Sequence, residues 1–234
     1  MHTSRMTRAI ALCGTALFGG ASVALAQTDM GMSPRRTPGF VQFGLEGGAS
    51  IANFIGSDAG NSKNRTGLYG GLTMLIQPQT SAIGFQTGVL YVEKGAKANN
   101  EPTDIGNLTG SINLRYIEVP VLVRIGVPMS FAGVSPTIMA GASLGYRVGC
   151  RIETSGTGFN SSFDCDDALG EDDFDTKRFD GGVSVGVEIP VAVGSSFILV
   201  PSVRYIRSLT NVVNGSNDDI KNSNVLIGVG FRFR

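Results

Sequence analysis

The chain has 234 residues, among them 33 glycines and no tryptophan, and its formal net charge at pH 7 is zero. This composition disfavours long helices and suits strands and turns, so it predicts a single all-β domain. The balanced charge gives no reason to expect a nucleic-acid partner.

The N-terminal residues have the pattern of a signal peptide. Arg5 and Arg8 precede an apolar run over Ala9–Ala24, and Ala24 and Ala26 fit the small-residue pattern that signal peptidase reads before Gln27. The run is interrupted by glycines and is shorter than the roughly 20 apolar residues of a spanning helix. We therefore expect export, with a retained anchor helix as the less favoured alternative.

Three segments follow from this interpretation. Residues 1–26 are expected to be the signal peptide, residues 27–39 a flexible leader without periodicity, and residues 40–234 an outer-membrane β-barrel domain. No second apolar stretch is long enough for a spanning helix, so a helical inner-membrane protein is excluded.

Apolar residues recur at every second position from Phe40 onward, which is the pattern of strands with one apolar face. Eight such runs can be counted, over residues 40–51, 68–76, 83–91, 116–127, 138–148, 179–189, 197–206 and 224–233. Pro120 and Pro201 fall inside two of them, so we expect a bulge at each.

The connections between these runs alternate in length. Three are short, and the other four are long and rich in Asn, Asp, Ser and Gly, over residues 54–65, 94–111, 149–177 and 210–222. Short turns at one end and long polar loops at the other are typical of an outer-membrane barrel. The expected fold is an eight-stranded antiparallel up-and-down transmembrane β-barrel.

The polar face of the strands consists of Gly, Ser, Gln, Glu and Arg, which fits the inside of a barrel rather than a water-exposed outer wall. Eight strands leave an interior just wide enough for side chains, so the apolar face must meet lipid. Aromatic residues near strand ends would form the girdles at the membrane boundaries. They are Tyr91, Tyr146, Phe179, Tyr205, Phe231 and Phe233.

Seven charged residues fall on the expected inward face: Glu46, Glu118, Arg124, Arg147, Glu188, Arg204 and Arg232. Buried charges are tolerated only when they are paired, so we predict a network of Glu–Arg bridges that fills the bore. The alternative is a narrow ion path whose selectivity these charges set.

Three stretches resemble a known family. They are FGLEGGASIANFIG with KNRTGLYGGL, GVLYVEKGAK leading to LRYIEVPVLVRI, and RYIRSLTNVV with IKNSNVLIGVGFRF. Over about residues 40–233 the chain is similar to the small outer-membrane β-barrel domain labelled "porin family" or PorT-like. The resemblance implies a narrow barrel in the bacterial outer membrane and names no substrate.

The cysteine and histidine content indicates which disulfide and which catalytic arrangements the chain can form. Cys150 and Cys165 are the two cysteines outside the expected signal peptide, and an oxidising compartment predicts a disulfide between them. The one histidine is His2, so Ser–His and Asp–His hydrolytic arrangements are not expected in the mature chain. No catalytic residue, cofactor or metal site is predicted.

The acidic segment 164–175 does not fit an EF-hand loop, because Leu169 stands where Gly is needed and Asp175 where Glu belongs. We interpret it as a solvated loop, with loose binding of divalent cations left open.

These observations favour a structural or surface-interaction scaffold that holds four long loops outside the cell. A small passive channel is the alternative, a lipid-modifying membrane enzyme comes third, and a soluble periplasmic binding barrel fourth. The expected partners are outer-membrane lipid and lipopolysaccharide, and the expected state is a monomer. No partner of the loops can be named.

Overall fold

The computed structural model describes residues 40–233, apart from residues 61, 79–80, 99–100, 104–105, 129–134, 157–158, 166–176, 195 and 213–218. The predicted signal peptide and leader lie outside the described residues. No helix in the described part is long and apolar enough to cross a membrane.

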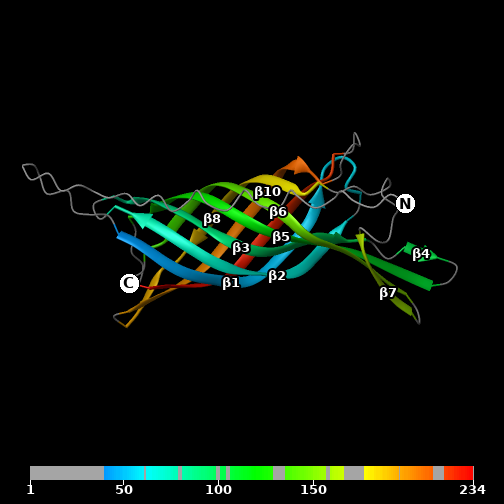
Figure 1. Cartoon of the computed structure of the whole chain (residues 1–234), viewed down its shortest axis with the longest axis horizontal. Helices are drawn as coiled ribbons and strands as arrows, with labels where there is room; N and C mark the ends of the chain where they lie inside the picture. The colour runs from blue at the N-terminus through cyan, green and yellow to red at the C-terminus, as the bar shows by residue number, and fades with distance from the viewer. Residues whose placement is uncertain are drawn as a thin grey trace, which may run out of the picture. The chain divides into compact units, whose positions relative to one another are not determined.

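The described residues form strands that run up and down in chain order (Figure 1). Their bounds are β1 Phe40–Ile55, β2 Lys63–Gln77, β3 Ile83–Lys97, β4 Glu101–Thr103, β5 Gly106–Gly126, β6 Thr137–Gly156, β7 Phe159–Asp164, β8 Phe179–Glu188, β9 Val191–Val193, β10 Phe197–Asn211 and β11 Lys221–Phe233.

Eight of these strands close into an antiparallel ring. β1, β2, β3, β5, β6, β8, β10 and β11 each pair with the next along the chain, and β11 pairs back onto β1 from Gly44↔Arg232 to Ile55↔Lys221. Closure pairs the backbone groups of both end strands, which is what a sheet in lipid requires. The predicted eight-stranded antiparallel barrel is confirmed.

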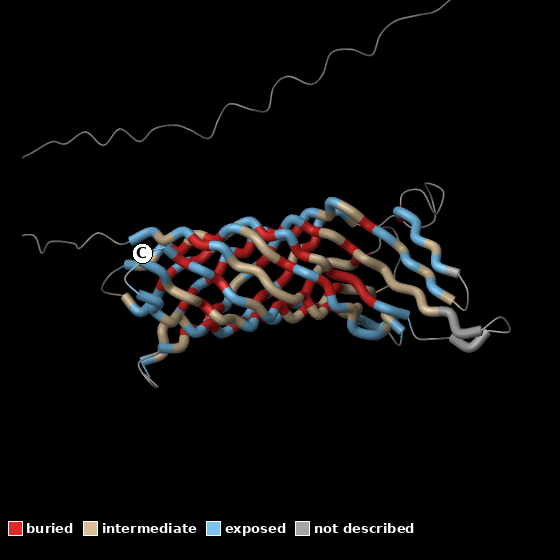
Figure 2. The backbone as a smooth tube through the Cα atoms, turned by 90° about the horizontal axis from the view of Figure 1, so that it is seen from below, coloured by how far each residue is buried: buried red, intermediate tan, exposed pale blue. Residues whose placement is uncertain are grey.

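Buried residues recur between more exposed ones along the strands of the ring, as the colours along the tube in Figure 2 show. On β8, Phe179 and Val183 are exposed, whereas Asp180, Ser184 and Glu188 are buried. The apolar side chains therefore point outward and the polar ones into the bore. This is the reverse of a soluble barrel and matches a wall that faces lipid.

Three short strands extend the ring beyond its eight members. β4 pairs with β5, β7 with β6, and β9 with β10. Together with the long β3, β5 and β6, the short β4 and β7 make much of the expected loops 94–111 and 149–177 part of the sheet, so those loop boundaries were wrong. Beyond the membrane both faces of a strand meet water, so the apolar alternation fades while the hydrogen-bond ladder continues.

A bulge in β6 changes which of its residues face the bore. Tyr116 pairs with Arg147 but Arg115 pairs with Gly149, which leaves Val148 without a partner on β5. An extra residue in one strand reverses the facing of the residues after it. Cys150 is consequently buried.

The bulges predicted at Pro120 and Pro201 are absent from the described pairings. Pro120 stays in register with Ser143, and Pro201 with Val229. The Pro201 carbonyl also accepts a hydrogen bond of 2.9 Å from the Ile189 amide. A proline removes one donor from the ladder, and here the pairs on either side hold the register without an inserted residue.

Candidate functional site

The first cluster of buried charge lies in the bore toward the long-loop end. Lys94 Nζ is 2.7 Å from Glu118 Oε2 and 3.0 Å from Asp180 Oδ2, and all three side chains are almost fully buried. Ser143 Oγ donates a hydrogen bond to Glu118. The lysine ammonium is also 5.1 Å from the centre of the Tyr116 ring, which places it over an aromatic face.

Asp180 has further partners from two more strands. Thr210 Oγ1 on β10 donates to its Oδ1 over 3.1 Å, and Asn222 Nδ2 on β11 donates to its Oδ2 over 3.2 Å. The cluster therefore ties together strands on several sides of the ring. A buried carboxylate that is both paired and hydrogen-bonded avoids most of the penalty of burial.

The second cluster lies toward the short-turn end. Glu188 pairs with Arg124 and accepts a hydrogen bond of 2.9 Å from Arg232 Nη1. Arg232 Nη2 also donates to Gln86 Oε1 over 3.2 Å. Two arginines thus share one carboxylate inside the barrel.

A further ion pair joins β1 and β10. Arg204 Nη2 donates to both carboxylate oxygens of Glu46, at 3.1 and 3.3 Å, and the arginine side chain is 3% exposed.

Six of the seven charges predicted to face the bore belong to the ion pairs described above, namely Glu46, Glu118, Arg124, Glu188, Arg204 and Arg232. Glu118 pairs with a lysine instead of an arginine, and Arg147 is half-buried beside Tyr116 in the β5–β6 pairing. Sequence reasoning missed Lys94, which was assigned to a loop, and Asp180. Continuing the alternation of β3 past Leu90 and Val92 would have placed Lys94 on the inward face.

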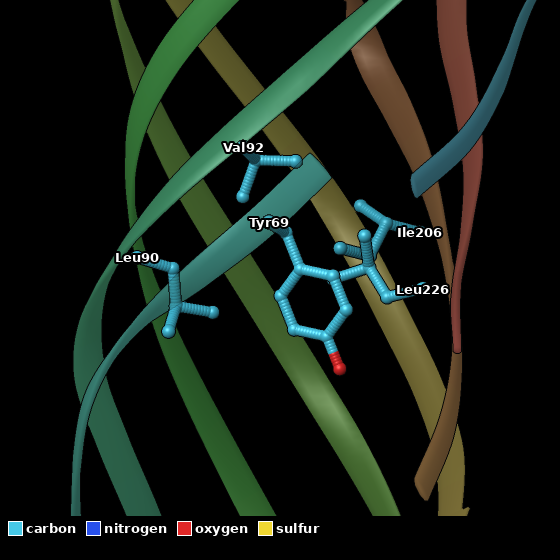
Figure 3. Packing of buried hydrophobic residues seen from close by; sticks show 5 residues of the cluster. All are labelled: Tyr69, Leu90, Val92, Ile206 and Leu226. Atoms are coloured by element: carbon cyan, nitrogen blue, oxygen red, sulfur yellow. The ribbon is translucent and has the colours of Figure 1, made fainter. Parts of the chain in front are cut away.

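Apolar side chains fill the bore as well. Tyr69 projects into the space between Leu90, Val92, Ile206 and Leu226, which come from β3, β10 and β11 (Figure 3). Each of these five residues is at most 5% exposed. The middle of the barrel is therefore occupied by side chains.

Two cavities lie at opposite ends of the barrel. The cavity at the long-loop end has a volume of about 470 Å³, and Phe54, Ala96, Ile112 and Ile152 are among its lining residues. The cavity at the short-turn end has about 410 Å³ and includes Arg124 and Arg232 in its lining. The two cavities share no lining residue.

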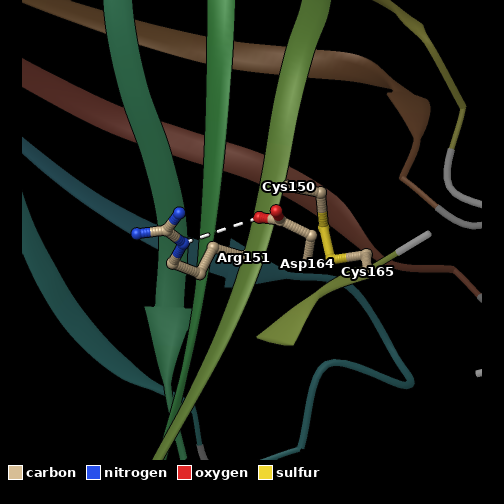
Figure 4. Close-up of a disulfide and its surroundings, with 4 residues drawn as sticks. All are labelled: Cys150, Arg151, Asp164 and Cys165. Atoms are coloured by element: carbon tan, nitrogen blue, oxygen red, sulfur yellow. Dashed lines mark ion pairs between the residues drawn. A yellow bond between two sulfur atoms is a disulfide. The ribbon is translucent and has the colours of Figure 1, made fainter. Parts of the chain in front are cut away.

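A disulfide joins Cys150 of β6 to Cys165, which follows β7, with the two Cα atoms 5.4 Å apart (Figure 4). The predicted bond is confirmed. It packs against Leu114, Tyr116 and Val212 at the mouth of the bore. Beside it, the exposed ion pair Arg151–Asp164 spans 3.5 Å in the same hairpin.

The charged groups described above form ion pairs in the described part of the chain. No group of three or more His, Cys, Asp or Glu side chains in that part of the chain is placed to hold a metal ion. The acidic segment lies outside the described residues from 166 to 176.

A closed antiparallel barrel with an apolar outer wall and a polar interior defines a bacterial outer-membrane protein. The sequence profile described as outer membrane protein beta-barrel domain matches residues 25–214, and the chain belongs to that family. The family resemblance and the outer-membrane location predicted from sequence are confirmed.

No curated protein matches the chain. Among solved structures, it is similar to Neisserial surface protein A, with 16% identity, a TM-score of 0.44, and 82% of this chain and 96% of that one covered. Ail, the attachment invasion locus protein of Yersinia pestis, has 14% identity and a TM-score of 0.38, with 84% and 100% covered. Outer membrane protein W of E. coli has 17% identity and a TM-score of 0.40, with 84% and 98% covered.

Proposed function

We propose that the protein is a non-enzymatic surface-interaction scaffold, a barrel with a filled bore that holds an extended rim outside the cell. The observation that carries this proposal is the filling of the bore. Lys94, Glu118 and Asp180 occupy it near one end, and Arg124 and Glu188 near the other. Function is therefore assigned to the rim.

The rim is the part of β5, β6 and β7 that continues past the eight-stranded ring at the long-loop end. It offers surface for such an interaction. The sheet continues there through the pairing of β5, β6 and β7, and a cavity of about 430 Å³ opens between these strands. Its lining is mostly hydroxyl and amide side chains together with one lysine and one glutamate: Lys97, Thr109, Ser111, Glu153, Thr154, Ser155, Asn160, Ser161 and Ser162. Such a lining suits a polar, hydrogen-bonding partner.

The passive-channel alternative is less favoured because the charges that would line a pore are paired with each other. An ion path needs rings of charge or carbonyl groups that face water. Here Arg204 is bound to Glu46, and Lys94 lies between two carboxylates. The same pairing argues against an enzyme, since general acids and bases need access to a substrate.

Site-directed labelling on intact cells tests which end is displayed. Asn160→Cys places a thiol on β7 at the rim, and the matched control Ser196→Cys places one at an exposed position of the short-turn end. A membrane-impermeant maleimide should label the first variant on intact cells and the second only after the outer membrane is opened. The reverse pattern would contradict the proposal.

A further inference from the structure

Among the described residues, the outward-facing cations of the barrel lie at one end. In the described residues near the short-turn end, the exposed outward positions are apolar, as at Phe43, Phe85, Ile125, Val187 and Phe231. The long-loop end instead carries six basic residues on six strands, here called the basic collar: Lys63, Lys97, Arg115, Arg151, Arg207 and Lys221.

The burial of the adjacent residues shows in which direction the collar side chains point. Arg115 lies between the buried Leu114 and Tyr116, and Arg207 lies between the buried Ile206 and Ser208. Because strand side chains alternate, both arginines point away from the bore. The collar therefore lies on the outer wall, outside the filled interior, and it meets the rim at Lys97, which also lines the rim cavity.

Two collar residues, Arg115 and Arg207, lie next to tyrosines that mark the level where lipid ends. Tyr205 precedes Arg207 by two positions on the outward face of β10, and Tyr91 precedes Glu93, the residue that pairs with Arg115. Both tyrosines are partly exposed, at 39% and 37%. Tyrosines of this kind mark the boundary between acyl chains and headgroups, so the cations come at headgroup height.

Several collar charges have no ion-pair partner among the described residues, namely Lys63, Lys97, Arg115 and Arg207. Lys63 and Lys97 are directly opposite each other on β2 and β3, and both are exposed. Like charges directly opposite across two strands repel. A multiply charged anion between them would turn this repulsion into attraction.

The guanidinium of Arg115 lies against the backbone at Gly149. A Cβ atom on Gly149 would be 2.6 Å from both Nε and Nη2 of the Arg115 side chain. The guanidinium therefore lies flat on β6 at headgroup height, where its planar donors suit phosphate oxygens.

We propose that the basic collar binds the phosphate groups of a phosphorylated glycolipid in the outer leaflet. A zwitterionic phospholipid would bring a cation of its own to the four collar residues without an ion-pair partner, and the described residues of the short-turn end include no outward-facing cation. The asymmetry matches a bilayer whose two leaflets differ in charge. This inference goes beyond the proposed function, since it concerns the outer wall.

Binding to vesicles of stated composition tests the collar. The full-length protein, folded in phosphatidylcholine vesicles, is titrated with bis-phosphorylated lipid A and separately with its dephosphorylated form. Binding of the phosphorylated form should be stronger and should weaken as sodium chloride is raised. Equal binding of the two forms would overturn the proposal and would leave the rim function untouched.

Substitutions of exposed collar residues test whether lipid A binds at the collar. Lys63→Gln combined with Lys97→Gln and Arg115→Gln should weaken lipid A binding roughly a hundredfold, since each cation near a charged surface contributes comparably. Glu153→Gln, which removes an acid at the same end, is the matched control and should not weaken binding. Unboiled gel mobility shows whether each variant is folded, and unchanged binding by the folded triple variant would overturn the assignment.

Discussion

The Lys94 ammonium lies 2.7 Å from the Glu118 carboxylate, and the two side chains are 2% and 0% exposed. They come from neighbouring strands, and Asp180 reaches the same ammonium from the β8 side of the ring. A cation held between two carboxylates in the bore is both a structural support and an obstacle to ions.

Removing the charge of Lys94 should destabilise the barrel. Lys94→Met leaves Glu118 and Asp180 buried without a cation, which should lower the free energy of unfolding by about 3 to 5 kcal/mol. Urea unfolding, followed by the ratio of folded to unfolded bands in an unboiled gel, measures the change. The exposed neighbour Lys97→Met is the control and should shift the midpoint little; equal midpoints for the two variants would refute the role of Lys94.

The Glu46–Arg204 pair should show strong coupling. Arg204→Met alone leaves the Glu46 carboxylate without its partner and should cost about 3 kcal/mol, whereas Glu46→Leu combined with Arg204→Met should restore much of that loss. A double-mutant cycle in urea measures the coupling energy, expected between about 0.5 and 3 kcal/mol. Simple additivity of the two changes would show that the pair is not formed.

The Cys150–Cys165 bond should stabilise the rim hairpin. Closing a loop of this length contributes about 3 kcal/mol in the chain-entropy model. Cys150→Ser combined with Cys165→Ser should therefore speed proteolysis of the β6–β7 hairpin while the barrel keeps its unboiled gel mobility. Intact mass checks the bond itself, because reduction must add two hydrogen atoms; an unchanged mass would mean that the bond is absent.

The rim should loosen at acidic pH at the contact between the β1–β2 and β10–β11 connections. The Asp219 amide donates to Asp58 Oδ2 over 2.8 Å, and this bond, with one from Ser57, lowers the pKa of the Asp58 carboxyl. A lowered pKa means that the stabilisation is present above the ordinary value and is lost as pH falls through the lowered one. The protection factor for hydrogen exchange at the Asp219 amide, which is the intrinsic exchange rate divided by the observed rate, should fall over that range.

Asp58→Ala, which removes the hydrogen-bond acceptor along with the charge, is the control for this pH effect. Its exchange should be fast at neutral pH and should not show the acid transition. If the wild-type amide showed the same pH profile as this variant, the Asp58 contact would not hold the two connections together.

Much of the fold could be predicted because one physical constraint repeats along the chain. A lipid-facing wall requires an apolar residue at every second position, so the run 179–189 nearly reproduces β8. The polar β7 has no such constraint, since both of its faces meet water beyond the membrane, and its alternation is absent from the sequence.

The pairing inside the bore was harder to predict. Alternation places Glu118 and Asp180 on the inward face, but which cation reaches them depends on the register of strands that are distant in sequence. The partner of Glu118 is Lys94, whose strand continues past the apolar run. The single unpaired Val148 likewise determines that Cys150 faces inward, and no residue type in that segment signals it.

The most direct test of the filled bore is conductance in planar lipid bilayers. The folded wild-type protein, with its heat-modifiable gel mobility verified before insertion, should give no steady single-channel current steps. Steady steps from the wild-type protein that disappear in Arg124→Ala would show that the interior charges line an open path, and would contradict the account.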